Sequence, residues 1–331
     1  GNVTQIGEQG FNIGRIAALI AGFPVTTAGT TVNRMCASSL QAVNFGAQGV
    51  MSGMHDLIIG AGVESMSRVG MGTDGGALSE TLQDRFDIIN QGLSAEMIAQ
   101  KWGQTRQQLD QMAFESHQRA IAAQDNGWFD AEILPIEVTG PEGEKIMFQV
   151  DEGPRRGTSL EKLASLKPAF KDDGVVTAAG ASQISDGAAA ILIGSKAKAD
   201  ELGLKTRAKF RAMAVAGVDP TIMLTGPIPA TQKVLKKAGL TMDDIGLFEV
   251  NEAFAPVVLS WAQDMAPGHH EKLLERTNVN GGAMALGHPL GCSGARLLTT
   301  LLHEMERRDV QYGLATLCIG FGMAVATVIE R

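Results

Sequence analysis

Hydrophobic and polar residues alternate along the chain in two rhythms, one helical and one strand-like, which predicts a protein of the α/β class. Helical segments carry small and apolar residues over three or more turns, and short runs of Val, Ile and Leu are typical of buried strands. We predict helices over residues 11–23, 37–53, 105–125 and 292–305, and strands over residues 26–33, 56–65, 181–195 and 312–322. Residues 247–262 read as a strand that passes into a helix.

A polar and glycine-rich stretch interrupts this alternation from about residue 70. It holds one helical piece and looks like an excursion from the first unit. The sequence therefore predicts an N-terminal half formed by residues 1–69 and 179–206, a loop domain over residues 70–178 and a C-terminal half over residues 207–331.

The two halves show a weak internal sequence repeat. Val32-Asn33, a small-residue helix and the strand "DLIIGAG" correspond in order to Val279-Asn280, the helix "CSGARLLTTLLHEM" and the strand "YGLATLCIGFG". A duplicated α/β unit is the simplest account of this order and spacing.

Charge and composition narrow the classes of function. The net charge of −8 argues against nucleic-acid binding, and 40 glycines among 331 residues indicate tight turns and close backbone approach. No apolar run is long enough to span a membrane. Three widely spaced cysteines suggest a reducing compartment, for which we expect the cytoplasm. An anionic ligand would need a local basic patch, and the candidates are Arg155, Arg156, Lys162, Lys167 and Lys171.

Four short segments carry candidate chemistry. Cys36 precedes a predicted helix, whose N-terminal N–H groups favour a thiolate, although an isolated cysteine more often only packs in a core. His288 lies between Gly287 and Pro289, where it is either aimed at a ligand or a structural turn residue. Asn251 stands where a strand turns into a helix and could merely cap it, and Cys318 ends an apolar strand. Together they offer a nucleophile, a base, an acid and an oxyanion donor.

These segments, "CASS", "NEAFA", "GHPLG" and "CIGFG", resemble in that order the active-site motifs of the thiolase family. The resemblance covers the whole chain. It implies two duplicated α/β halves packed as a layered α-β-α-β-α core with an added loop domain. It also implies thiolytic cleavage of a 3-ketoacyl-CoA in fatty-acid or steroid side-chain β-oxidation.

The resemblance also implies a role for each residue. Cys36 would accept the acyl group, Cys318 would move the proton at the substrate α-carbon or the CoA sulfur, and His288 would activate Cys36. His288 with a water held by Asn251 would form one oxyanion hole, and the backbone N–H groups of Cys36 and Gly320 would form the second.

Coenzyme A enters this scheme as a substrate, so the resemblance implies neither a metal nor a redox cofactor. In the loop domain, Arg155 of "DEGPRRGTSLEKL" would contact a CoA phosphate, and Ser182 of "ASQIS" would meet the pantetheine arm.

Three features depart from the family pattern. Ser39 and Phe321 stand where such proteins usually carry glycine. The chain also begins after the point where thiolases have their first strand, helix and second strand, so we expect the first sheet to lack members. This leaves open an organellar targeting segment ahead of residue 1.

Several alternatives stay open at this point. A biosynthetic acetoacetyl-CoA thiolase would use the same four residues with a smaller pocket. A catalytically silent lipid-binding or scaffold protein would be expected to lack at least one of them. A zinc site formed by Cys36, Cys318 and His288 lacks the close ligand spacing that such sites show. The resemblance implies a homodimer or homotetramer paired through the region of "GVESMSR", or a complex with a hydratase/dehydrogenase subunit.

Overall fold

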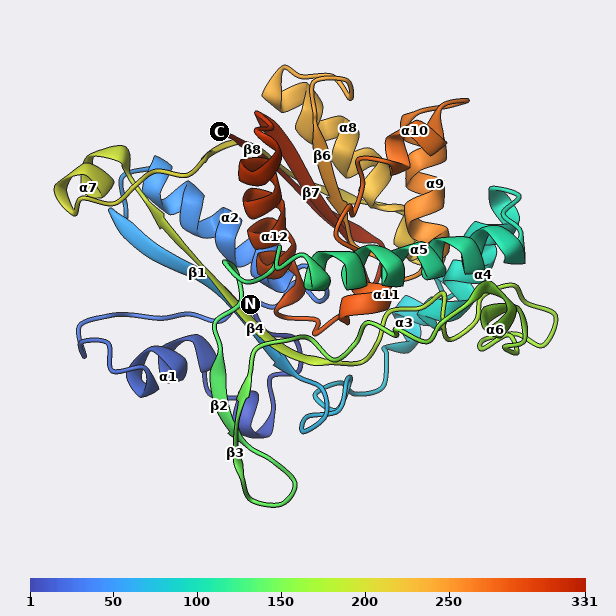
Figure 1. The fold of residues 1–331 in the computed structure, drawn as a ribbon, viewed down its shortest axis with the longest axis horizontal. Coiled ribbons are helices and arrows are strands. Elements are labelled where there is room, and N and C mark those ends of the chain that lie inside the picture. Colours follow the sequence, from blue (N-terminus) through green and yellow to red (C-terminus); the bar gives the residue numbers. More distant parts are fainter.

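Two buried helices form the middle layer of the structure, a computed structural model that describes all residues 1–331. Helices α2 (Ser38–Met51) and α12 (Ser293–Arg308) pack against each other and lie between two β-sheets. Figure 1 shows both helices, with β1 and β4 on one side and β7 and β8 on the other.

The four-stranded sheet has the order β5-β8-β7-β6, in which β6 and β7 are parallel and the other pairs are antiparallel. The second sheet has two antiparallel strands, β1 and β4, paired from Leu57↔Gly194 to Ser65↔Asp186. A separate hairpin joins β2 and β3. The strands are β1 (Leu57–Ser65), β2 (Ile136–Thr139), β3 (Lys145–Phe148), β4 (Asp186–Gly194), β5 (Lys209–Gly217), β6 (Leu247–Val250), β7 (Tyr312–Ile319) and β8 (Met323–Glu330).

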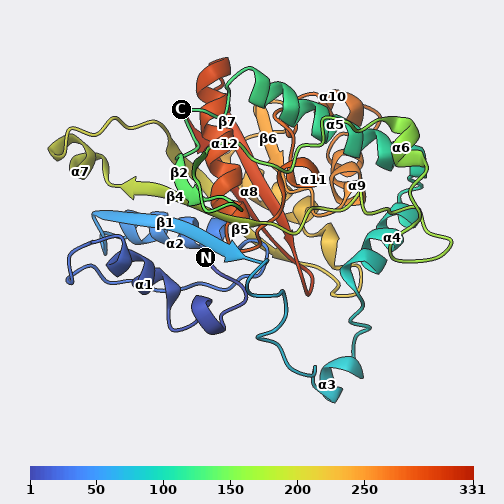
Figure 2. The same ribbon diagram turned by 60° about the horizontal axis from the view of Figure 1, so that its bottom comes forward.

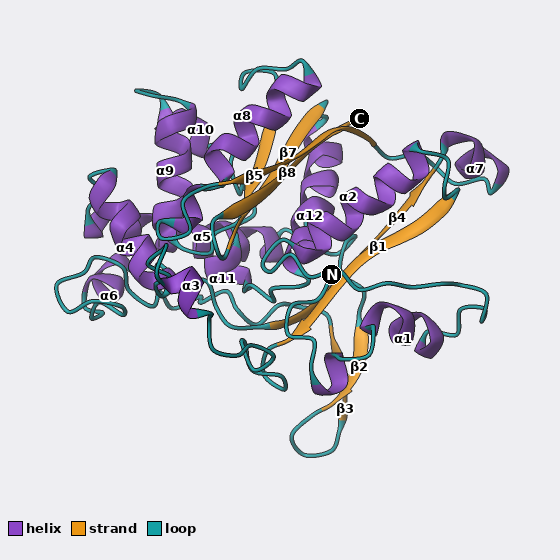
Figure 3. Ribbon diagram, turned by 180° about the vertical axis from the view of Figure 1, so that it is seen from behind, coloured by secondary structure: helices purple, strands orange, loops and turns teal.

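Further helices cover the outer faces and the long excursion (Figures 2 and 3). They are η1 (Gly7–Gln9), α1 (Ile13–Ile20), α3 (Glu80–Gln83), α4 (Gln91–Lys101), α5 (Arg106–Asp125), α6 (Leu160–Ala164), α7 (Lys196–Glu201), η2 (Met223–Thr225), α8 (Pro227–Ala238), α9 (Ala255–Met265), α10 (His270–Leu274) and α11 (Ala283–Leu286). None of these helices, nor α2 or α12, combines the length and apolar character needed to cross a bilayer.

Strands β6, β7 and β8 of the four-stranded sheet are buried on both faces, and their successive side chains enter two different cores because they point to opposite sides. Phe248 and Leu314 join the core under α8 and α9, where Phe248 meets Trp261 edge to face at 5.3 Å. Leu317 and Val325 join the other core, which α2 and α12 cover. Burial on both faces explains the continuous apolar runs in the sequence.

The two middle helices approach each other at their first turns. A Cβ on Gly294 would lie 2.3 Å from the backbone nitrogen of Leu40, so only glycine permits this contact. Ser39 fastens the same contact, since its hydroxyl donates to the Cys292 carbonyl and accepts from the Ala295 N–H, both at 2.9 Å. The serine that departs from the family pattern therefore has a structural place between α2 and α12.

Most predicted elements are present. Helices α1, α2, α5 and α12 and strands β1, β4 and β7 lie within or close to their predicted ranges, and the layered α/β class is confirmed. The strand predicted over residues 26–33 is wrong: an isolated bridge between Arg34 and Cys36 is the nearest strand-like pairing. Threonines 30 and 31 instead pack against Gly14 of α1, and no neighbouring strand offers this segment a ladder.

Glu64 at the end of β1 ties the N-terminal segment to the loop that leads into α12. This carboxylate is 1% exposed and accepts from the backbone N–H groups of Val3, Thr4 and Gly291 at 2.8 to 3.1 Å. The Gln9 amide donates to it as well, at 3.0 Å. One buried side chain thus ties two separate backbone segments to the end of β1.

We predict that Glu64→Ala lowers the free energy of unfolding by about 3 kcal/mol, because several buried N–H groups lose their acceptor. Urea denaturation followed by circular dichroism measures this change. Glu8→Ala is the matched control, since Glu8 forms an exposed ion pair with Arg68 at 2.6 Å. Its effect should stay within about 1 kcal/mol. Equal losses for the two variants would contradict the role given to Glu64.

Candidate active site

Cys36 lies at the start of α2, two residues before the first helical residue. The backbone N–H groups of Gly320 and of Cys36 itself act on its sulfur and lower the pKa of the thiol. Burial nevertheless raises the pKa of the Cys36 thiol to about 11 and outweighs both donors. The expectation of a favoured thiolate at this helix terminus is therefore wrong for the resting site, where the sulfur carries its proton.

The residue before Cys36 has an uncommon backbone conformation. Met35 has φ of 44°, in the left-handed region that few non-glycine residues adopt. Two short-range bonds hold this turn: the Ser38 hydroxyl donates to the Met35 carbonyl at 2.6 Å, and the Arg34 N–H donates to the same hydroxyl at 2.9 Å. The strained turn brings the Cys36 sulfur toward the end of β7.

Cys318 is fully buried on β7 and lies close to Cys36. Burial raises the pKa of the Cys318 thiol strongly, and a thiolate at Cys36 would act in the same direction. A thiol with a high pKa beside a second thiol is suited to hold a proton and release it only to a strong base. The structure thus brings together both predicted cysteines and Gly320.

A second cluster joins Asn251, His288 and Ser293. The Asn251 Nδ2 lies 3.3 Å from His288 Nε2, and His288 Nδ1 lies 2.5 Å from the Ser293 hydroxyl. Because that hydroxyl donates to the Pro289 carbonyl at 2.9 Å, it accepts from Nδ1–H. Because the Asn251 Nδ2–H group faces Nε2, Nε2 is the nitrogen that carries the lone pair.

The His288 ring is neutral. Burial lowers its pKa to about 3, and the positive charge of Arg296 acts in the same direction. The backbone around it is fixed, since the His288 N–H donates to the Gln183 carbonyl at 3.0 Å. No hydrogen bond joins His288 to Cys36, so the predicted activation of Cys36 by His288 rests on no direct contact in this structure.

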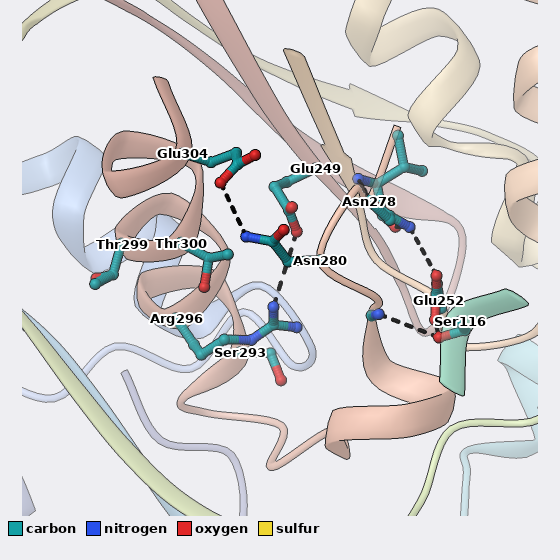
Figure 4. A network of polar contacts seen from close by, with 12 residues as sticks. Ser116, Glu249, Glu252, Asn278, Asn280, Ser293, Arg296, Thr299, Thr300 and Glu304 are labelled. Atoms are coloured by element: carbon teal, nitrogen blue, oxygen red, sulfur yellow. Dashed lines mark hydrogen bonds and ion pairs between the residues drawn. The ribbon is translucent and has the colours of Figure 1, made fainter. Parts of the chain in front are cut away.

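The residues that hold Asn251 in place were not found from the sequence. Asn278, with φ of 48°, bonds both the N–H and the carbonyl of Val250 at 2.8 Å and donates to Glu252 at 3.0 Å. Ser116 of α5 donates to the same carboxylate at 2.6 Å (Figure 4). Ser293 lies five residues after His288 at the start of a helix, and this spacing could have predicted its contact with His288 from the sequence. Ser116 lies far away in the sequence and offered none.

The residues predicted to contact CoA lie at the edge of this region. Arg155 is exposed, and its backbone N–H donates to His117 Nδ1 at 3.1 Å. The Ser182 N–H donates to the Ala253 carbonyl at 2.9 Å, which places Ser182 next to the segment that carries Asn251. Two members of the predicted basic patch are paired with acids, Arg156 with Asp125 and Lys171 with Asp173.

Phe321 occupies the turn between β7 and β8 with φ of 60° and is 38% exposed. A bulky residue in this region is an outlier and strains the turn. Its two neighbours are packed: a Cβ on Gly320 would lie 3.1 Å from the Gln91 amide, and one on Gly322 would lie 3.0 Å from the Pro220 Cα.

No group of three His, Cys, Asp or Glu side chains is placed to hold a metal ion, so Cys36, Cys318 and His288 do not form a ligand set.

Comparison with known proteins identifies the family. The family model described as thiolase, N-terminal domain, matches residues 1–197, and the one described as thiolase, C-terminal domain, matches residues 204–331. The 3-ketoacyl-CoA thiolases of Photobacterium profundum and Escherichia coli are both 50% identical over 100% of this chain and 86% of their own length.

Solved structures agree. The acetyl-CoA acetyltransferase of Bacillus anthracis superposes with a TM-score of 0.89 at 38% identity and is covered over 85% of its length. Human mitochondrial 3-ketoacyl-CoA thiolase gives the same TM-score and identity and is covered over 86% of its length. In both cases the match spans 100% of this chain. The chain belongs to the thiolase family.

Proposed function

We propose that this protein cleaves 3-ketoacyl-CoA with coenzyme A, giving acetyl-CoA and a shortened acyl-CoA in fatty-acid degradation. The relatives that share half of its residues over the full chain are named for this substrate. The observation that carries the proposal is the meeting of Cys36, Cys318 and the Gly320 N–H beside the Asn251–His288 pair.

The first half-reaction transfers the acyl group to Cys36. The sulfur forms a bond to the 3-keto carbon as its proton passes to His288. The bond between C2 and C3 then breaks, and its electron pair goes to C2 of the leaving acetyl-CoA enolate. Cys318 donates its proton to C2, which leaves an acyl-cysteine and a thiolate.

The second half-reaction returns the protein to its first state. The Cys318 thiolate takes the proton of a new CoA thiol, whose sulfur attacks the acyl-Cys36 carbonyl. Cys36 leaves and regains its proton from His288. Two oxyanions arise in this sequence, and each needs its own donors.

The two donor sets have separate structural support. The N–H groups of Cys36 and Gly320 both face the sulfur, next to which the oxygen of the attacked carbonyl carbon would develop negative charge. The Asn251 Oδ1 atom is buried without a protein partner, as expected of a residue that holds a water beside His288. Removal of one such donor typically lowers the rate 10²- to 10³-fold.

Resting pKa values set a requirement for this chemistry. With the pKa of Cys36 near 11 and that of His288 near 3, both groups are neutral at pH 7. The proton must therefore leave Cys36 as the new carbon–sulfur bond forms. The developing oxyanion in its donor set is what stabilises the imidazolium at that moment.

CoA binds across the excursion over residues 70–178, in our proposal, with Arg155 at a phosphate and Ser182 at the pantetheine arm. Arg155 takes part in no ion pair, so its charge is available to an anion, whereas the neighbouring Arg156 is neutralised by Asp125 at 2.7 Å. Ser182 and Gln183 connect this region to His288, because the Gln183 amide also donates to the Gly153 and Ala285 carbonyls at 3.0 Å.

An open surface hollow with a mixed polar and apolar lining is our candidate site for an acyl chain longer than acetyl. It measures about 430 Å³ and is lined by Gln83, Phe86, Asp87, Ile88, Ile89, Met97 and Thr221. Gln91 and Pro220, which are close to lining residues in the sequence, lie against Gly320 and Gly322 of the β7–β8 turn. A hollow with a volume in the range of ligand pockets, whose chain neighbours reach the turn that carries Gly320, supports degradation of longer substrates over biosynthetic acetoacetyl-CoA synthesis.

The silent scaffold is disfavoured by the site itself. A lipid carrier has no need of two adjoining buried thiols beside a neutral histidine, nor of a buried amide oxygen without a partner, which opposes stability. For the quaternary structure we propose a homodimer or homotetramer that acts in the cytoplasm; a hydratase/dehydrogenase subunit remains the alternative partner.

We predict that intact protein incubated with a 3-ketoacyl-CoA, without free CoA, gains the mass of one acyl group. Cys36→Ala should abolish the adduct and reduce turnover by at least about 10⁴-fold, because the covalent path is lost. Intact-mass spectrometry and a CoA-release assay measure the two effects.

Cys292→Ala is the control for that experiment, since Cys292 is a buried free cysteine outside the proposed chemistry. It should keep the adduct. An adduct that survives Cys36→Ala would place the nucleophile elsewhere, and a wild-type chain that forms none would favour the scaffold.

We also predict that Met97→Trp lowers kcat/KM for a long-chain 3-ketoacyl-CoA about tenfold while acetoacetyl-CoA cleavage stays within about twofold, because the larger ring fills the hollow. Met71→Trp is the matched control, as Met71 is 60% exposed and does not line the hollow. A uniform loss on both substrates would show that the acyl tail lies elsewhere.

A further inference from the structure

The side chain of Gln183 joins two segments that are far apart in the sequence. Its Nε2 group donates to the carbonyls of Met284 and Ala285 at 2.9 and 3.0 Å, and to the carbonyl of Gly153 at 3.0 Å. The first two carbonyls belong to α11, and the third lies in the excursion that forms the proposed CoA site. One amide group therefore holds the proposed CoA-binding segment against the helix that ends two residues before His288.

These contacts satisfy carbonyls at the end of α11. The last four carbonyls of a helix lack an N–H partner within the helix, and α11 is only four residues long. Gln183 supplies donors to two of them, and its own backbone carbonyl accepts from the His288 N–H at 3.0 Å. Gln183 thus holds the residues on both sides of Gly287, whose φ of 87° is a conformation that favours glycine.

The backbones of the two segments are in close contact. A Cβ on Gly153 would lie 2.3 Å from the Ala285 carbonyl oxygen, so the contact requires a glycine. Two residues further on, the Arg155 N–H donates to His117 Nδ1 on α5 at 3.1 Å. The segment over residues 153–155 is therefore fastened to α11 at one end and to α5 at the other.

We propose that Gln183 is a positioning residue that couples CoA binding at Arg155 to the placement of His288. The proposal rests on the function proposed above and adds a residue that acts through His288 rather than on the substrate. Because one amide group holds both segments, a shift of the CoA-binding segment displaces the end of α11 and, with it, the backbone of His288. A misplacement of about 1 Å at a reacting group can lower a rate about 10²-fold, so this contact bears directly on acyl transfer.

The test is Gln183→Met, which keeps the length of the side chain and removes both N–H donors. We expect the acylation rate of Cys36 at saturating 3-ketoacyl-CoA to fall about tenfold and KM for CoA to rise about tenfold, because both segments lose their common donor. Rapid quench with intact-mass detection measures the acylation, and steady-state kinetics measure KM. Hydrogen–deuterium exchange should increase in residues 151–157 and 283–288 together, and this readout does not depend on activity.

Gln124→Met is the matched control. The Gln124 amide donates to the Asp151 carbonyl at 2.8 Å, so it holds the same segment from α5 without reaching α11. This variant should increase exchange in residues 151–157 alone and leave the acylation rate of Cys36 within about twofold, since the end of α11 keeps its donors. An equal loss of acylation in the two variants overturns the proposal, because general loosening of the excursion would then explain both.

A double-mutant cycle with Arg155→Ala tests the coupling itself. Arg155→Ala alone should raise KM for CoA about tenfold through the loss of a phosphate contact. If Gln183 places the segment that carries Arg155, the same change made in Gln183→Met should raise KM further by less than about threefold. Effects that simply multiply overturn the proposal, because a residue that only stabilises the fold would not alter the contribution of Arg155.

A second variant, Gly153→Ala, tests the same contact if Gln183→Met does not fold. The added Cβ would collide with the Ala285 carbonyl and separate the two segments while Gln183 is retained. A Gly153→Ala protein with wild-type acylation and KM overturns the proposal, and so does a Gln183→Met protein that loses only stability. A wild-type protein that forms no acyl-Cys36 refutes the proposed function, whereas hydrogen–deuterium exchange still shows whether Gln183 joins the two segments.

Discussion

The close contact between the first turns of α2 and α12 is the constraint on which the site depends. Gly294 lets the two backbones meet at Leu40, and Ser39 bonds across the junction to Cys292 and Ala295. Because Cys36 precedes one helix and His288 precedes the other, this single contact sets the separation between the nucleophile and the base. Both helices are covered by a sheet on each side, so neither can move without opening a core.

Half of the six non-glycine residues with left-handed backbones lie beside the chemistry-bearing residues. Three non-glycine residues with left-handed backbones, Met35, Asn278 and Phe321, lie beside Cys36, Asn251 and Gly320 respectively. Each such conformation costs about 1–3 kcal/mol and persists only where the surroundings fix it. Here the fixing groups are visible: Ser38 bonds around Met35, Asn278 bonds Val250 and Glu252, and the β7–β8 pairing closes on both sides of Phe321.

The sequence predicted the layered fold and the four chemistry-bearing residues because both depend on local patterns. Buried helices and strands carry their periodicity, and "NEAFA" or "GHPLG" marks a strand-to-helix turn within a few residues. The strand predicted over residues 26–33 failed because its β-branched pattern is only half of what a strand needs; the other half is a neighbour to pair with. Propensity cannot report whether that neighbour exists.

The supporting residues escaped prediction for a related reason. Ser116, Asn278 and Glu64 act through contacts between segments far apart in the chain, and a polar residue inside an apolar stretch looks the same whether it is satisfied or orphaned. The direction of the Cys36 pKa shift could not be predicted from the sequence either. A helix N-terminus favours a thiolate by a few tenths to 1 kcal/mol, whereas full burial acts several times more strongly in the opposite direction. Only the folded structure shows that the Cys36 side chain is 5% exposed.

Burial of this degree decides how the site handles charge. With Cys36, Cys318 and His288 all neutral at rest, no ion pair has to be desolvated before the substrate arrives, and the folded protein is spared the cost of holding one. Charge separates only when the 3-keto oxygen of the substrate reaches its N–H donors, so the anion is stabilised in the transition state and not before. Binding that strengthens only at that point accelerates the chemical step rather than merely tightening the substrate complex. The high pKa of the nucleophile is therefore compatible with catalysis, provided that the proton acceptor stays neutral until it is needed.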